Sequence, residues 1–329
     1  MPRLQHLWPL GLLVGFVAAL PLWSAKSSLA FLTGVYRYPP VAQPVPHSSI
    51  EAAFVSWVDP SAAQQIQQLL FRAERRRALP LLTLEPFADP AIAGGERTLV
   101  RDVEQGRYKA RLAAVLDQLC RRQQPVLLRF AHEMDHTGQY PWSLAKGADY
   151  VRLYRSVWAQ AQQPRCRRLH WVWSPAGNGD PRAFWPGADA VDLIGVSVYS
   201  SPRWQSDGSL RSFAEIYDQR RWLHLHYRKP LLIAEMGVSG SGEQRRRWLR
   251  EARSAVACYP ELLGWVYFSA PQPRWIPLPT GHEDWTLPAL ALPLVVAPPE
   301  LRSPACTFLD VSVPPFARQL CPPPQRLAS

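Results

Sequence analysis

The sequence is poor in several features that mark common classes of protein. Its 329 residues include only five cysteines, and none form a C-x-x-C pair, which argues against a structural zinc cage. No glycine-rich phosphate turn follows an early strand-like run, as an open nucleotide-binding sheet would need. Acidic residues number 26 against 37 basic ones, a net charge of +11. The basic residues are spread over helix-like stretches without a nucleic-acid-binding motif, so we expect solvated helix faces and no nucleic-acid partner.

The N-terminus carries an uncharged run from Leu7 to Trp23. This length is long for the apolar core of a signal peptide and at the short limit for a spanning helix. We interpret residues 1–28 as a signal peptide or membrane anchor. The rest of the chain is then expected to be exported to the periplasm or outside the cell, with the membrane as a partner through this segment alone.

The five cysteines fall into two groups. Cys306 and Cys321 lie 15 residues apart in a proline-rich tail and could form a disulfide in an oxidising compartment. Cys120, Cys166 and Cys258 lie in helix-like or helix-end sequence. We expect these three to be buried thiols.

Short apolar runs alternate with helix-patterned segments along most of the chain. The runs are 31–38, 52–58, 79–86, 125–133, 169–175, 191–199, 230–237 and 262–270. Their nearly continuous apolar character is typical of parallel strands covered on both faces. The first helix is expected to have Asp59 as its cap and Pro60 at its first position. Only the links after the first and fifth runs lack a long helical pattern.

This rhythm predicts an α/β fold, a (β/α)8 TIM barrel over residues 31–282, because eight such units occupy about 240 residues. A doubly wound open sheet is the alternative. Residues 283–329 are rich in proline and show no helical period. We interpret them as a C-terminal extension that wraps the barrel or reaches toward the membrane, or else as a partly disordered linker.

The segment AHEMDHTGQYPW (131–142) contains a formal H-E-x-x-H match through His132 and His136. Such a zinc site requires both histidines on one face of a helix. A strand-like run precedes the motif, and a glycine and a proline follow within five residues of His136. Because a helix has no room there, we expect neither a metal nor another cofactor, and we interpret His136 as a loop residue near substrate.

Two glutamates end strands that face each other across such a barrel. Glu133 ends the fourth strand and Glu235 the seventh, each within an apolar run. Catalytic residues of these barrels lie at the C-terminal ends of strands. Two carboxyl groups placed there can lie about 5–5.5 Å apart, the separation used for double displacement. The pair is therefore predicted to be catalytic.

Three segments together resemble glycoside hydrolase family 26, whose best-known members are β-mannanases. They are LLRFAHEMDHTGQYPW, WVWSPAGNGDPRAFWPGADAVDLIGVSVY and KPLLIAEMGVSG, and the resemblance covers about residues 31–280. It implies a retaining mechanism with Glu133 as acid/base and Glu235 as nucleophile. The implied substrate is a β-linked polysaccharide of the β-1,4-mannan type, with β-glucan and xylan as alternatives, and a monomer is expected. A catalytically silent carbohydrate-binding or envelope protein on the same barrel is the second hypothesis, and an H-E-x-x-H zinc hydrolase is the third and least favoured.

The residues expected to bind substrate or support the carboxylates are Arg129, His132, Trp142, Trp173 and Tyr199. The resemblance implies that Tyr199 donates a hydrogen bond to Glu235. Arg129 lies on the same strand face as Glu133 and is expected to hold Glu235 ionised. His132 is expected to contact the sugar at the cleaved bond, and the two tryptophans are candidate stacking platforms.

The chain departs from the family pattern at four positions. Asp135 stands where asparagine is usual, and Ser197 where aspartate commonly precedes the tyrosine of the sixth strand. Phe268 and Ser269 stand where a tryptophan–arginine pair is typical. These changes affect the substrate cleft more than the carboxylates, so they bear on mannan specificity and not on the chemistry.

Overall fold

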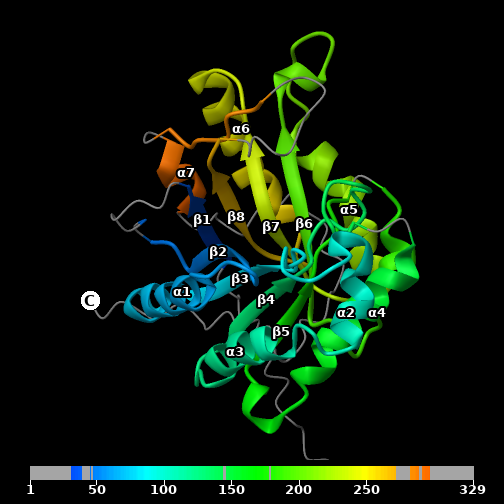
Figure 1. Cartoon of the computed structure of the whole chain (residues 1–329). Coiled ribbons are helices and arrows are strands. Elements are labelled where there is room, and N and C mark those ends of the chain that lie inside the picture. Colours follow the sequence, from blue (N-terminus) through cyan, green and yellow to red (C-terminus); the bar gives the residue numbers. More distant parts are fainter. Residues whose placement is uncertain are drawn as a thin grey trace, which may run out of the picture.

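Eight parallel strands close into a ring at the centre of the structure, a computed structural model (Figure 1). It describes residues 31–38, 45, 47–143, 146–177, 179–271, 282–288 and 291–296. The strands follow one another in chain order: β1 (Leu32–Arg37), β2 (Ile50–Ser56), β3 (Leu79–Glu85), β4 (Val126–Phe130), β5 (Leu169–Trp173), β6 (Leu193–Ser200), β7 (Leu231–Val238) and β8 (Leu262–Ser269). Because β8 also pairs with β1, the ring is a closed barrel, which confirms the predicted fold and excludes the open sheet.

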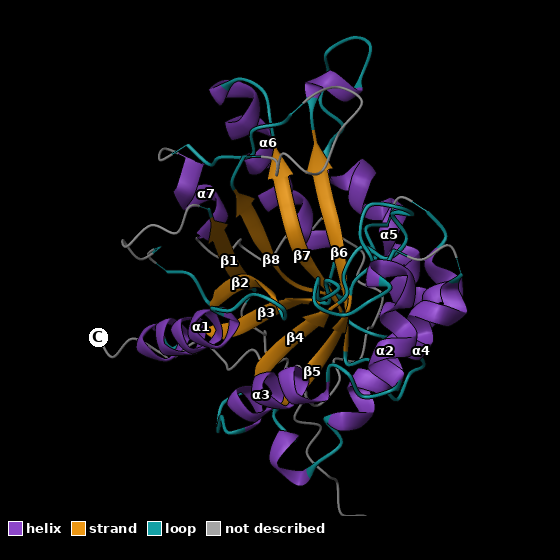
Figure 2. Ribbon diagram, viewed as in Figure 1, coloured by secondary structure: helices purple, strands orange, loops and turns teal. Residues whose placement is uncertain are grey.

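The helices lie around the outside of the ring (Figure 2). They are α1 (Ala62–Arg76), α2 (Leu99–Glu104), α3 (Lys109–Cys120), α4 (Gly147–Gln160), α5 (Phe213–Tyr227), α6 (Gly242–Ala255) and α7 (Leu292–Val296). Capping boxes start α5 and α6, since Ser212 and Ser241 each exchange hydrogen bonds with the residue three positions on. The described residues between β5 and β6 contain only a short 3-10 turn (Pro181–Phe184), as the sequence predicted.

The core has two layers because each strand is covered on both faces. A small cluster fills the barrel interior with side chains from every strand: Leu32, Ile50, Leu79, Leu81, Leu127, Val172, Leu193, Leu232, Leu263 and Val266. A larger cluster lies between the strands and the surrounding helices. The strand residues above the interior cluster, toward the C-terminal ends, are free to be polar, and there the barrel carries its charged groups.

Two element boundaries differ from the prediction. α1 begins at Ala62, because the Asp59 carboxylate accepts hydrogen bonds from the Ser61 backbone and hydroxyl and closes a turn before the helix. Asp59 and Pro60 thus precede the helix. β4 ends at Phe130, three residues before Glu133, for a reason that belongs to the site.

The described part of the C-terminal extension packs on the barrel. Trp285 is buried, and the Ser269 hydroxyl accepts a hydrogen bond from the Leu287 backbone. The short helix α7 was not expected from the sequence, and the Val296 carbonyl at its end accepts a hydrogen bond from Thr33 on β1. Residues 1–28 lie outside the described part of the chain. Among the helices that the structure describes, none is both long and apolar enough to cross a membrane.

The cysteine prediction was wrong for the first three residues. Cys120, at the end of α3, forms a disulfide with Cys166, which precedes β5. Cys258 is disulfide-bonded as well. The helix-like sequence around Cys120 and Cys166 gave no sign of a disulfide, because the end of α3 and the turn before β5 meet only once the barrel has closed. Cys306 and Cys321 lie outside the described residues.

Candidate active site

Glu133 enters the barrel mouth through an unusual turn after β4. Ala131 and Glu133 both adopt left-handed backbone conformations, with φ of 50° and 52°. This region is costly for non-glycine residues and is concentrated at functional sites. Backbone hydrogen bonds hold the turn, with the Ala131 N–H donating to Leu84 O and the Glu133 N–H to Ser174 O. The strand therefore stops early, and the carboxylate points into the mouth.

Glu235 is aimed by an irregularity in β7. Val196 pairs with Ile233, but the next residue, Ser197, pairs with Glu235, so β7 contains one extra residue, Ala234. A bulge of this kind re-aims the side chains that follow it and is common beside active sites. It brings Glu235 next to Ser197 at the mouth.

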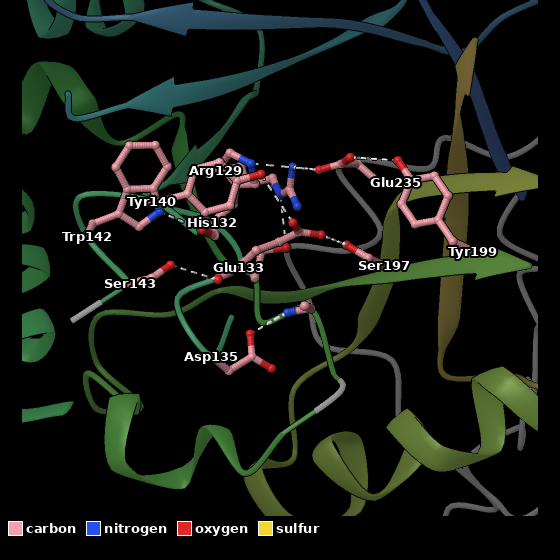
Figure 3. A network of polar contacts seen from close by, with 12 residues as sticks. Arg129, His132, Glu133, Asp135, Tyr140, Trp142, Ser143, Ser197, Tyr199 and Glu235 are labelled. Atoms are coloured by element: carbon pink, nitrogen blue, oxygen red, sulfur yellow. Dashed lines mark hydrogen bonds and ion pairs between the residues drawn. The ribbon is translucent and has the colours of Figure 1, made fainter. Parts of the chain in front are cut away.

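The Glu235 carboxylate is held by two side chains (Figure 3). Nη1 of Arg129 lies 2.5 Å from Oε1, and the Tyr199 hydroxyl donates to Oε2 at 2.8 Å. Both contacts were predicted. Gly237 makes room for this tyrosine, because a Cβ at that position would lie 2.6 Å from its ring. One cation and one hydrogen-bond donor thus fix the position of this carboxylate.

The Glu133 carboxyl has different neighbours. The Ser197 hydroxyl donates to Oε1 at 2.5 Å, and the Tyr140 hydroxyl to Oε2 at 3.3 Å. Burial and the nearby Glu235 charge raise the pKa of Glu133 to about 7, although Arg129 and the Ser197 hydrogen bond oppose the rise. The two carboxyls of the site thus have different hydrogen-bond partners, and only Glu235 is paired with a cation.

His132 is turned inward between the two glutamates. It is 2% exposed, and its Nε2 lies 4.0 Å from Oε1 of Glu235. Burial and the Arg129 charge hold the pKa of His132 well below its usual value, so its ring is neutral. The turn after β4 buries this side chain beside Glu235, and its expected contact with the sugar stays a prediction.

Three other residues expected at the substrate are fully buried in the structure. Trp142 is fully buried, stacks on Tyr140, and donates its indole N–H to the His132 carbonyl. Trp173 is fully buried as well, packed edge to face against neighbouring rings. Arg129 is also completely covered. Trp142 supports the site from below its surface, Trp173 packs against Trp185 and Tyr227, and Arg129 pairs with Glu235.

The remaining polar residues of the H-E-x-x-H segment, Asp135 and His136, belong to the loop that follows β4. Asp135 accepts hydrogen bonds from the backbone N–H groups of Ala176 and Gly177 and ties the loop after β5 to the loop after β4. His136 lies in a turn and not in a helix. No group of three or more potential metal ligands occurs among the described residues. The helical geometry that a zinc site of this type needs is therefore missing.

Several residues at the mouth were not identified from the sequence. Tyr36, Phe54 and Phe268 form a half-buried cluster of rings, which we call the aromatic wall. Glu85 ends β3 beside it, and Trp204, 39% exposed, follows β6. Glu85 could have been found from the sequence, since it lies near the end of an apolar run as Glu133 and Glu235 do. It was missed because no motif around it resembled a known catalytic segment.

The structure is thus an eight-stranded parallel barrel with two supported carboxylates, one within β7 and one beyond β4. Residues 97–236 match the family model described as glycosyl hydrolase family 26. The three sequence segments above indicated a resemblance to the same family, and the first two of them lie within this match.

Two characterised relatives are similar to parts of the chain. A β-1,3-xylanase of Alcaligenes is 25% identical over 169 residues, covering 50% of this chain and 34% of the relative. A mannan endo-1,4-β-mannosidase of Bacillus subtilis is 30% identical over 208 residues, covering 56% of this chain and 52% of the relative. The chain thus spans about a third to half of the length of these relatives.

The fold itself recurs in a solved structure, GH26C from a Muricauda species. The two superpose with a TM-score of 0.58 at 14% identity, covering 74% of this chain and 79% of the other. At this identity the likeness concerns the fold alone.

Proposed function

We propose that this protein is a retaining glycoside hydrolase that cleaves a β-linked polysaccharide by double displacement. The observation that carries the proposal is the difference between the surroundings of Glu133 and those of Glu235. One carboxyl is buried with a raised pKa, and the other is held by a cation and a tyrosine. Acid and nucleophile roles follow from these surroundings.

In the first step, neutral Glu133 donates its proton to the glycosidic oxygen while Glu235 attacks the anomeric carbon. The carbon–oxygen bond to the leaving sugar breaks, and a glycosyl ester forms on Glu235. The ester no longer carries the negative charge that raises the pKa of Glu133, so this pKa falls. Glu133 is then suited to take a proton from the water that attacks the ester and restores both groups.

The polysaccharide proposed first is of the β-1,4-mannan type, which the Bacillus mannosidase supports. The Alcaligenes relative is a β-1,3-xylanase, so xylan is the principal alternative. Ser197 and Phe268 line the mouth where the family pattern expects other residues, and they give this chain its own sugar contacts. Product analysis on mannan, xylan and β-glucan decides between these substrates.

We further propose that the protein works outside the cytoplasm as a monomer. The Cys120–Cys166 disulfide supports this location, because such bonds persist in oxidising compartments. Membrane attachment through residues 7–23 remains part of the proposal. Fractionation of cells expressing the full chain, with the cysteine redox state measured in each fraction, tests the location and the membrane attachment.

Azide rescue of two alanine variants tests the mechanism on an aryl glycoside of the sugar that the polymer screen identifies. Glu133→Ala should regain turnover with azide and yield the β-glycosyl azide, because azide attacks the glycosyl ester. Glu235→Ala should yield the α-azide, because azide then replaces the nucleophile itself. Identical products from both variants would contradict the assignment.

The controls separate the competing functions. Glu243→Ala, at an exposed position on α6, should leave activity unchanged. A chelator should also leave activity unchanged, whereas a zinc hydrolase would lose it. Oligosaccharide binding without any product release from the unaltered protein would favour the silent carbohydrate-binding alternative.

A further inference from the structure

Glu85 is a third carboxyl group at the barrel mouth. It is the last residue of β3, and the alternation of that strand places it on the same face as Leu79 and Leu81, which belong to the interior cluster. Its neighbour in β2 is Ser56, and its backbone carbonyl accepts a hydrogen bond from Trp57. The backbone is thus fixed while the side chain rises from the interior toward the mouth.

The environment of Glu85 is electrostatically unfavourable. Burial and the neighbouring Glu235 charge raise the pKa of Glu85 to about 7. The positive charge of Arg129 opposes this rise only in part. No described residue donates a hydrogen bond to this carboxyl or forms an ion pair with it. Buried structural carboxylates of the same barrel are paired, as Glu51 is with Arg72 and Arg76. A merely structural carboxyl is expected to have such partners.

The aromatic wall lies next to this carboxyl. Tyr36 stacks on Phe268 with ring centroids 5.2 Å apart, and Phe54 meets both rings edge to face. Glu85 is the strongest charged neighbour of the Tyr36 hydroxyl. All three rings are half-buried, so part of each remains accessible at the mouth. An apolar surface beside a polar group without a partner is the composition of a small-ligand site.

We infer that Glu85 is a sugar-binding residue that holds hydroxyl groups of the glycone unit, the sugar that becomes attached to Glu235, against the aromatic wall. The inference rests on the proposed hydrolase function. A carboxylate accepts from two neighbouring hydroxyls, and a protonated carboxyl also donates to one. These bonds satisfy the group only when substrate is present, which explains why the described residues leave it without a partner.

Glu85 is distinct from the catalytic pair. Arg129 and Tyr199 hold Glu235, and Ser197 and Tyr140 hold Glu133, whereas none of these four donates to Glu85. Because Glu85 binds hydroxyls whose position and orientation differ between sugars, it is a specificity-determining residue for this chain.

Oligosaccharide binding measured by calorimetry in a Glu133→Gln background tests the inference, since that background does not turn over substrate. The ligands are oligosaccharides of the polymer that the unaltered protein cleaves, or of all three candidate polymers if it cleaves none. Adding Glu85→Ala should weaken binding by about 10- to 100-fold, the range for loss of charge-assisted hydrogen bonds. Adding Glu85→Gln, which keeps an acceptor of the same shape, should weaken it less.

A deoxy-sugar series then assigns the bond. The oligosaccharide lacking the hydroxyl that Glu85 holds should bind weakly in the Glu133→Gln background but no more weakly than the parent sugar once Glu85 is alanine. Glu243→Ala in the same background should leave affinity unchanged, and circular dichroism verifies folding of each variant.

The outcomes separate the inference from the proposed function. Hydrolysis by the unaltered protein together with unchanged binding in the Glu85→Ala variant would overturn the role of Glu85 and leave the hydrolase intact. If the unaltered protein hydrolyses none of the polymers but its oligosaccharide binding depends on Glu85, the proposed hydrolase function would be overturned and the sugar-binding role of Glu85 would stand.

Discussion

Ser197 is the residue that links the two halves of the catalytic pair. It is the backbone neighbour of Glu235 across the β6–β7 ladder, and its hydroxyl donates to Glu133. A donor stabilises the ionised carboxylate, so this bond limits how far burial raises the pKa of Glu133. Ser197, one of four positions that depart from the family 26 pattern, therefore adjusts the acidity of Glu133 as well as the proposed sugar contacts.

Replacing Ser197 by alanine should shift the pH dependence of catalysis. Without the hydroxyl, the pKa of Glu133 rises above about 7, and the proton is retained to higher pH. The alkaline limb of kcat/KM should move upward by roughly one pH unit, the worth of a hydrogen bond to a charged group. The measurement is the pH–rate profile of the purified variant.

Ser239→Ala is the matched control, because the hydroxyl of Ser239 is buried and has no hydrogen-bond partner among the described residues. Its alkaline limb should coincide with that of the unaltered protein. An unmoved or downward-shifted limb in Ser197→Ala would show that another group sets the titration.

At the scale of elements, the strand ends and the segments that follow them build the cleft. The 3-10 turn Pro202–Trp204 follows β6, and Trp204 lies 5.7 Å from the ring of Trp285. Trp285 in turn lies 4.8 Å from Tyr199, the hydrogen-bond donor to the nucleophile. An exposed indole at this distance from the reacting centre is placed to stack on a sugar remote from the cleaved bond.

Trp204→Ala should weaken the use of long substrates more than short ones. Loss of one stacking face is expected to raise KM for the polymer roughly tenfold, with little change for an aryl glycoside that does not reach this position. The control is Phe71→Ala, which removes an exposed ring from the outer helix α1. Equal effects on both substrates would argue against a remote stacking role.

The Cys120–Cys166 disulfide joins α3 to the turn before β5 across 46 residues of chain. Closing a loop of this length restricts the unfolded chain and typically stabilises the fold by about 2–4 kcal/mol. The double variant Cys120→Ala and Cys166→Ala should lose this amount in urea unfolding while the folded protein keeps its activity. An unchanged midpoint would mean that the disulfide adds no stability.

For the whole molecule, the buried carboxyl groups of Glu133 and Glu85 make stability depend on pH. The pKa of Glu133 is raised from 4.5 to about 7 by folding, so the folded state binds its proton more tightly than the unfolded state. The stability that this preference supplies is complete below pH 4.5 and is lost as the pH rises through 7. Glu85, whose pKa is also about 7, adds to the same loss.

Glu133→Gln should therefore gain thermal stability relative to the unaltered protein as the pH rises. The difference in Tm between the two proteins should be larger at pH 8 than at pH 4, because glutamine carries no charge to bury. Differential scanning fluorimetry across this range measures it, with Glu243→Gln as an exposed control expected to show no such trend. A difference that stays constant with pH would contradict the raised pKa.

Much of the fold was predictable because parallel strands covered on both faces leave a strong apolar signal. All eight strands and both central glutamates were located from their runs, and the Tyr199–Glu235 hydrogen bond was anticipated. Sequence pattern failed where contacts come from distant segments. The burial of Trp142 depends on a turn that places its indole under the His132 carbonyl, and no periodicity encodes that.

The sequence by itself determined the barrel and located Glu133 and Glu235 near the C-terminal ends of the fourth and seventh apolar runs, since hydrophobic patterning is local. Only the tertiary structure decided how the surroundings of these two carboxyls differ. The left-handed turn after β4, the extra residue in β7, the pairing of Cys120 with Cys166 and the burial of Glu85 each arise from elements that meet after the ring closes. Burial and neighbouring charge are properties of that closed ring, and they are what make one carboxyl an acid and the other a nucleophile in the proposed mechanism.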